Sequence, residues 1–141
     1  MSVLSLDVGH KRIGLAGCDP LGLTISRLPA IHRKTFQKDL KQLEQICQQR
    51  KVEALLIGLP LNEEGVLTKQ AKYCRTYGKR VAACLDLPMA LINEHSSTWA
   101  AQEAYKIRND RTGELDSAAA GLLLEQWLRE GPEVKPVHMP A

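Results

Sequence analysis

The sequence is poor in aromatic residues and lacks the patterns that mark membrane, secreted and zinc-binding proteins. Phe, Trp and Tyr together make up only 4% of the chain. No apolar run approaches the roughly 20 residues of a membrane-spanning helix, and the N-terminus runs directly into a strand-like segment, so we expect no signal peptide. No two cysteines form a CxxC pair and the histidines share no metal-ligand spacing, which argues against structural zinc. We expect a cytoplasmic protein without membrane association, whose cysteines stay reduced as small core residues: Cys18, Cys47, Cys74 and Cys84.

The remaining composition is that of an ordinary folded domain. The chain has 141 residues, of which 44% are hydrophobic and 25% are charged, enough for one core that buries about two-thirds of the unfolded surface. A net charge of +3 permits an acidic partner but does not require one. Because we find no internal repeat and no linker, we predict a single domain over residues 1–130. Residues 131–141 hold three of the seven prolines, and we expect them to form a loose tail.

Apolar periodicity predicts five strands and four helices. The strands are expected at Ser2–Asp7, Arg12–Cys18, Leu21–Ile31, Glu53–Leu59 and Met89–Asn93. The helices are expected at Thr35–Arg50, Val66–Leu85, Ser97–Ile107 and Ser117–Glu130. Short connections make the first three strands an antiparallel meander, whereas the later strands alternate with helices and should be parallel. The predicted fold class is therefore α/β, with a five-stranded mixed sheet and helices on both faces.

Two acidic residues stand at the ends of apolar strands. Asp7 lies in an apolar setting, where a carboxylate needs a partner or a metal to offset its desolvation. Glu94 follows the predicted strand that ends at Asn93, at the sheet edge where α/β proteins bind ligands. Each also has a plain structural explanation: Asp7 can start an Asx turn into Gly9, and Glu94 can be a solvated loop residue.

A third carboxylate, Asp116, precedes the last predicted helix. An N-cap Asp is common there and needs no function to explain it. However, the residues that follow, Ser117–Gly121, are all small, and they allow the helix to approach another backbone closely. Together, Asp7, Glu94 and Asp116 provide the hard oxygen ligands that suit Mg²⁺ or Mn²⁺, and two such ions can flank a scissile phosphate.

Several cations could face such a phosphate. Lys11 and Arg12 follow Asp7 closely, and Arg108 and Arg111 lie in the polar loop before Asp116. A further basic arc lies on one side of the second predicted helix: Lys69, Lys72, Arg75, Lys79 and Arg80. A solvated helix face explains such an arc more often than a nucleic-acid footprint does, so both interpretations stay open.

Four motifs in order resemble the YqgF (RuvX) family of RNase H-like proteins. They are Leu6–Gly9 with Arg12–Ala16, Gly58–Asn62 with Gly65, Asn93–Ala101, and Asp116–Ala120. They span nearly the whole chain except the Pro-rich tail. The chain departs from the family pattern at Asn93, where Asp is usual, and at His95, where Arg is usual.

The resemblance implies an RNase H-like fold and a catalytic, metal-binding triad of Asp7, Glu94 and Asp116. It also implies substrate contacts from Ser97 and Thr98 in the third motif. Members of the family are described as nucleases in the maturation of the 5′ end of the 16S ribosomal RNA precursor, and were earlier described as Holliday-junction resolvases.

The leading hypothesis is thus a metal-dependent phosphodiester hydrolase that acts on structured nucleic acid, with ribosomal precursor particles as a partner. RNA is favoured over a four-way DNA junction, because no helix shows a second apolar stripe for dimerisation and we expect a monomer. The alternatives are a junction resolvase and a non-catalytic binding module. An actin-like or sugar-kinase-like ATPase also shares the Asp7–Gly9 pattern, but it needs two such domains, and 141 residues make one.

Overall fold

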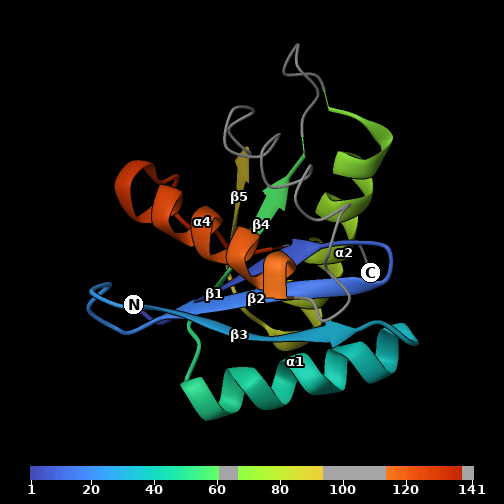
Figure 1. The fold of residues 1–141 in the computed structure, drawn as a ribbon, viewed down its shortest axis with the longest axis horizontal. Coiled ribbons are helices and arrows are strands. Elements are labelled where there is room, and N and C mark those ends of the chain that lie inside the picture. Colours follow the sequence, from blue (N-terminus) through green and yellow to red (C-terminus); the bar gives the residue numbers. More distant parts are fainter. Residues whose placement is uncertain (61–66, 94–113, 138–141) are drawn as a thin grey trace.

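The sheet of this protein has five strands with helices on both faces (Figure 1). The structure is a computed structural model that describes residues 1–60, 67–93 and 114–137. The strands are β1 (Val3–Val8), β2 (Arg12–Cys18), β3 (Ile25–His32), β4 (Ala54–Leu59) and β5 (Met89–Asn93). The helices are α1 (Phe36–Arg50), α2 (Lys69–Leu85) and α4 (Glu114–Glu130). The helix expected at Ser97–Ile107 lies outside the described residues.

The strand order is β3-β2-β1-β4-β5, which places β1 at the centre of the sheet. β1 pairs with β2, and β2 with β3, in antiparallel fashion. β1 pairs with β4, and β4 with β5, in parallel. The predicted meander followed by parallel strands is therefore confirmed, and the C-terminal ends of β1, β4 and β5 lie on one edge of the sheet.

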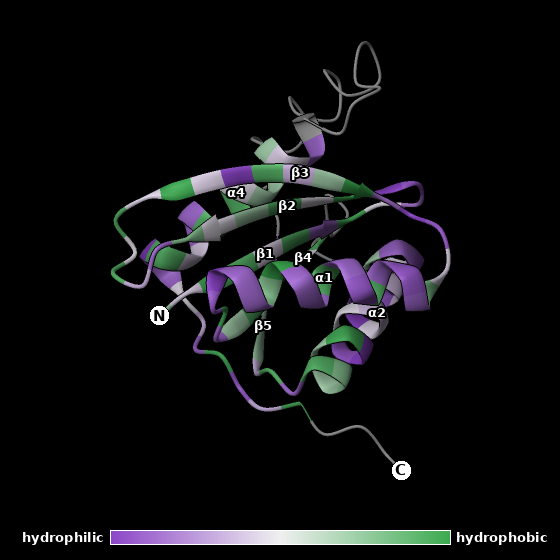
Figure 2. Ribbon diagram, turned by 90° about the horizontal axis from the view of Figure 1, so that it is seen from below, coloured by the Kyte–Doolittle hydropathy of each residue, from purple (hydrophilic) through white to green (hydrophobic). Residues whose placement is uncertain are grey.

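Alternate residues of β1 serve two separate hydrophobic layers. Leu4, Leu6 and Val8 pack on the face covered by α1 and α2, whereas Val3 packs on the face covered by α4. The expected apolar stripes of α1 and α2 contribute to the first layer. In the ribbon of Figure 2, hydrophilic residues make up much of α1, whereas β1 and β2 are mainly hydrophobic. Both faces of the sheet are thus buried, which explains the continuous apolar runs of its parallel strands.

Polar side chains explain where two elements begin later than the periodicity predicts. β3 starts at Ile25 rather than Leu21, because the carboxylate of Asp19 accepts hydrogen bonds from the backbone N–H of Leu21 at 3.2 Å and of Thr24 at 2.7 Å. The bond from the Thr24 N–H is the main reason that the pKa of Asp19 lies below its usual value. α2 starts at Lys69 because Thr68 caps it by accepting from the Ala71 N–H at 3.1 Å.

The start of the C-terminal tail is held against the sheet, and the expectation of a loose tail is wrong for residues 131–137. The backbone N–H groups of Met89 and Lys135 each donate to the other residue's carbonyl at 2.9 Å. In addition, Trp127 Nε1 donates to the carbonyl of Pro132 at 2.5 Å. The tail therefore covers part of the outer edge of β5, which no other described strand pairs.

Three of the four cysteines are buried as expected, but Cys84 is exposed on α2. Burial, together with the charge of Glu44, raises the pKa of the Cys47 thiol to about 11, so this thiol stays protonated and unreactive at neutral pH. Among the described helices, none has both the length and the apolar character to cross a bilayer.

Helix α4 approaches β2 most closely at Gly14. A Cβ atom built on Gly14 would lie 2.0 Å from the carbonyl oxygen of Asp116 and 2.8 Å from its Cβ. Both distances are shorter than real contacts, and the carbonyl belongs to the helix backbone, so the helix itself would have to move. At Gly17, by contrast, an added Cβ would meet only the side chain of Arg50, 2.6 Å from its Nε. Gly14 is thus the position in β2 that requires the absence of a side chain.

We predict that Gly14→Ala lowers the free energy of unfolding by about 3 kcal/mol, the upper range for a single overpacked group. Urea unfolding followed by circular dichroism measures the change. Gly17→Ala, on the same strand, is the matched control and should cost less, because the end of the Arg50 side chain can shift. Equal costs at the two positions would show that the α4 backbone is not held against β2.

Candidate active site

Asp7 is the acidic residue of the central strand. Its neighbours Leu6 and Val8 point into the α1–α2 layer, and strand alternation therefore directs Asp7 to the α4 face. The residue is half-buried near the C-terminal end of β1. It is directly opposite Gly14 of β2 in the antiparallel register. Asp7 thus lies beside the position where α4 meets the sheet.

Asp116, in the C-terminal helix α4, lies next to the same position. Because Gly14 has no side chain, the backbone and Cβ of Asp116 rest directly on it. Directly opposite residues in an antiparallel pair have Cα atoms about 4.5–5.5 Å apart, so Asp7 and Asp116 flank the same glycine. The fold therefore brings together two carboxylates that are 109 positions apart in the printed sequence (116 − 7).

The position of Asp116 within its helix differs from the expectation. The helix begins at Glu114 rather than Ser117, so Asp116 lies in the first turn and is not the N-cap. Acidic charge remains favourable there because of the helix dipole. The expected close approach of the small residues after Asp116 is confirmed, since Ala118, Ala119 and Ala120 are all buried.

Ser117 fixes the start of α4 across two strands. Its hydroxyl donates to the carbonyl of Leu28 in β3 at 2.6 Å and accepts from the backbone N–H of Leu15 in β2 at 3.3 Å. The residue is 3% exposed, so these bonds are shielded from water. Sequence reasoning missed this role of Ser117. A hydroxyl in an otherwise alanine-rich first turn was the available signal.

Arg12 forms an ion pair with Asp116. Its Nε donates to Oδ2 of Asp116 at 2.9 Å, and the two side chains are 25% and 10% exposed. The carbonyl of Arg12 also accepts from the N–H of Gly9 at 2.9 Å, which closes the turn after Asp7. Arg12 was expected to contact the phosphate backbone of a substrate, which stays a prediction; in the structure its Nε binds a carboxylate of the site. The guanidinium offsets part of the negative charge that burial concentrates there.

The other expected site residues divide into two groups. Lys11 is exposed on the turn between β1 and β2, next to Arg12. The remaining candidates lie outside the described residues: Glu94, Ser97, Thr98, Arg108 and Arg111. β5 ends at Asn93, whose carbonyl accepts from Nε2 of Gln126 in α4 at 2.8 Å. The last described residue before Glu94 is therefore tied to the same helix that carries Asp116.

The donor set suits a hard divalent cation, although the described part of the chain holds only two of the three expected ligands. Within that part, no group of three or more His, Cys, Asp or Glu side chains is placed to share an ion. Asp7 and Asp116 supply carboxylate oxygens, which are the ligands that Mg²⁺ and Mn²⁺ favour. Arg12 Nε already donates to Oδ2 of Asp116, so a cation bound by this carboxylate would share it with the guanidinium.

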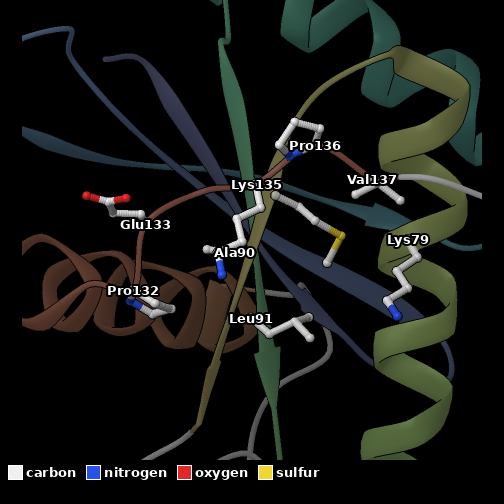
Figure 3. A pocket seen from close by; sticks show the side chains of 9 residues that line it. Lys79, Ala90, Leu91, Pro132, Glu133, Lys135, Pro136 and Val137 are labelled. Atoms are coloured by element: carbon white, nitrogen blue, oxygen red, sulfur yellow. The ribbon is translucent and has the colours of Figure 1, made fainter.

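A separate apolar cavity lies far along the sheet, at the β5 edge. It has a volume of about 480 Å³ and is bordered by Met89 and Leu91 of β5, Lys79 of α2, and the tail residues Pro132 and Val137. Figure 3 shows the tail passing beside β5 with these side chains around the hollow. Among the described residues that line it, Glu133 is the one carboxylate, whereas two acids lie beside Gly14.

Proteins similar in sequence match almost the whole chain. A protein of Prochlorococcus marinus (strain MIT 9313) named "Putative pre-16S rRNA nuclease" is 62% identical over 140 residues, which is 99% of this chain and 87% of that protein. A protein of Parasynechococcus marenigrum (strain WH8102) with the same name is 61% identical over 137 residues, 97% of this chain and 87% of that protein.

Solved structures of resolvases share the fold. Thermus thermophilus RuvC in complex with a Holliday junction substrate has a TM-score of 0.59 at 18% identity, covering 96% of this chain and 99% of that one. The fowlpox virus Holliday junction resolvase has a TM-score of 0.51 at 14% identity, covering 94% and 100%. The predicted RNase H-like fold class is confirmed by these likenesses.

The family model described as "RuvX: Holliday junction resolvase" matches residues 1–130. Both this description and the names of the relatives denote nucleases, which confirms the enzyme class expected from the sequence. The chain belongs to the RuvX (YqgF) family.

Proposed function

We propose that this protein is a divalent-metal-dependent nuclease that cuts the 5′ leader of the 16S ribosomal RNA precursor. The observation that supports it is the meeting of Asp7 and Asp116 over Gly14, with Arg12 paired to Asp116. A fold that holds two carboxylates side by side in a partly desolvated place must offset their repulsion, and a cation shared with substrate phosphate does so.

Asp7, Glu94 and Asp116 are the residues that we assign to hold Mg²⁺ or Mn²⁺, with two ions as the working stoichiometry. When bound, such ions stabilise negative charge on the scissile phosphate and activate the attacking water. The chain's own contribution is orientation: Ser117 and Gly14 fix the backbone of α4, and Arg12 fixes the carboxylate of Asp116. The exposed Lys11, and Arg108 and Arg111, which precede α4 in the sequence, are assigned to the phosphate backbone, and Ser97 and Thr98 to further substrate contacts.

The names of the close relatives favour ribosomal RNA as the substrate. The second candidate, a four-way DNA junction, is favoured by the description of the family model. A resolvase makes two symmetric cuts, which calls for a two-fold dimer. β3, an outer strand of the sheet, carries Pro29, and a proline without an N–H disfavours pairing with a second copy. We therefore favour a cytoplasmic monomer that works on ribosomal precursor particles.

We expect Asp7→Asn, Glu94→Gln and Asp116→Asn each to lower the cleavage rate by at least about a hundredfold, since each removes a charged oxygen ligand. The measurement is single-turnover cleavage of a labelled precursor leader in Mg²⁺ and in Mn²⁺. Asp86→Asn, at the exposed end of α2, is the matched control and should cut like the parent. If Asp7→Asn cleaved at the rate of the parent, Asp7 would not be a residue of the active site.

Metal binding is tested apart from catalysis by thermal unfolding in chelator and in excess Mn²⁺. A ligand at a hundred times its Kd stabilises the folded state by about 2.7 kcal/mol, so the melting temperature of the parent should rise. Asp7→Asn and Asp116→Asn should show a smaller rise, and Asp86→Asn the full one. If the two site variants gained as much as the parent, the ion would be bound elsewhere.

The substrate is tested by depleting the protein in its own host and mapping the 5′ ends of small-subunit RNA, while the purified protein is assayed on four-way DNA junctions. Depletion should lengthen the 5′ ends, and junctions should be cut poorly. Normal 5′ ends together with symmetric, metal-dependent junction cleavage would establish the resolvase instead. Binding of RNA without cleavage of either substrate would indicate a non-catalytic module.

A further inference from the structure

Arg33 connects the turn that follows Asp7 to helix α2. Its Nη1 donates to the carbonyl of Gly9 at 2.5 Å, and its Nη2 donates to the hydroxyl of Tyr73. The third nitrogen, Nε, lies 3.9 Å from Oδ2 of Asp39, a carboxylate that is 1% exposed. One guanidinium thereby holds the β1–β2 turn and the first part of α2 in a fixed relation.

The ring of Tyr73 is held in place yet remains open to solvent. Tyr73 is 42% exposed although its hydroxyl is bound by Arg33. The guanidinium carbon of Arg33 lies 5.4 Å from the ring centroid. The ring of His10 is stacked against it at 6.3 Å between centroids and 24° between planes. An aromatic face whose orientation is already fixed loses little conformational entropy when a flat ligand stacks on it.

The surroundings of this ring are basic. Three segments meet here: residues 9–12, 33–39 and 68–73. Their exposed cations are Lys11, Lys34, Lys38, Lys69 and Lys72. The one carboxylate in these segments is Asp39, which is buried and faces Arg33. The exposed charge of the three segments is thus entirely positive, and a single strand of nucleic acid needs this combination of cations and an aromatic face.

The ring and the carboxylates are linked through the β1–β2 turn. His10 is the third residue after Asp7, and three residues of fully extended chain span at most about 10 Å. The same short turn carries Arg12, which is paired with Asp116. Tyr73 and the carboxylates therefore lie at the same end of β1, with the ring on the α2 face and the carboxylates on the α4 face.

We propose that Tyr73, backed by His10 and oriented by Arg33, is a stacking platform for an unpaired base in the strand that carries the scissile phosphate. This proposal rests on the function proposed above, since it assigns a substrate subsite to that nuclease. Base stacking selects unpaired segments over continuous duplex, because a paired base has both faces covered by its neighbours. The platform thus defines the substrate as a strand that passes around the β1–β2 turn and carries an unpaired nucleotide on the α2 side of the cut.

The test measures binding of oligonucleotides that carry 2-aminopurine, a base whose fluorescence falls when it stacks. All proteins carry Asp7→Asn, so that the substrate stays intact. Tyr73→Phe retains the ring and should bind within about threefold of its parent with full quenching. Tyr73→Leu and Tyr73→Ala remove the ring and should each bind about tenfold more weakly with little quenching. Melting temperatures establish that all variants are folded.

The basic residues are tested by a matched pair on α2. Lys72→Ala, next to the platform, should weaken binding and lower the salt dependence by about one unit of slope. Lys79→Ala removes the same charge seven residues along the helix, about 10 Å away, and should change neither quantity. Equal effects of the two substitutions would show that α2 contributes only diffuse charge.

The platform is overturned if Tyr73→Leu binds and quenches as Tyr73→Phe does, or if blunt duplex binds as tightly as single strand. These outcomes are separable from failure of the nuclease itself. If the ring-dependent differences appear but the protein with Asp7 intact cuts nothing, the platform stands and the proposed function fails. If cleavage requires the carboxylates but the ring has no effect, the function stands and the platform fails.

Discussion

The absence of a side chain at Gly14 is the constraint on which the rest of the site depends. It lets the α4 backbone lie directly on β2, with the Asp116 carbonyl within 2.0 Å of where a Cβ would be. Asp7 is beside the same glycine on β1. Two carboxylates from opposite ends of the chain thus become neighbours through a contact between backbones. Such a contact is harder to adjust than one between flexible side chains, which suits a site that must hold its geometry.

Two polar side chains stabilise this contact in different ways. Ser117 binds the backbone of β2 and β3, so it positions the helix, whereas Arg12 binds the carboxylate of Asp116, so it orients the side chain. Leaving either acid without a counter-charge in a half-buried place would cost free energy. The arrangement places one cation of the chain on one acid and leaves the pair suited to a further cation.

The fold and part of the site could be predicted from sequence because their signals are local. Strand alternation and helical stripes are properties of short segments, and they predicted the order of the described elements correctly. The periodicity did not predict features that depend on single polar contacts. Asp19 binds the backbone of Thr24, so β3 begins later than expected. Lys135 forms backbone hydrogen bonds with Met89, so the tail lies against β5. The Arg12–Asp116 pair joins residues that are 104 positions apart in the sequence. Arg33 and Tyr73, which also contact one another, are 40 positions apart. No local pattern encodes which distant partners such side chains will meet.

The bridge between Lys135 and Met89 bears on how the chain folds during synthesis. Met89–Asn93 is complete as a strand long before Lys135 is made, 46 residues after Met89 (135 − 89). At the 5–20 residues per second at which ribosomes work, that interval lasts roughly 2–9 s. During those seconds the outer N–H and C=O groups of an apolar strand have no partner from the tail, and such an edge invites pairing with other chains. The segment around Lys135 therefore ends the period in which this part of the β5 edge is open to pairing with other chains.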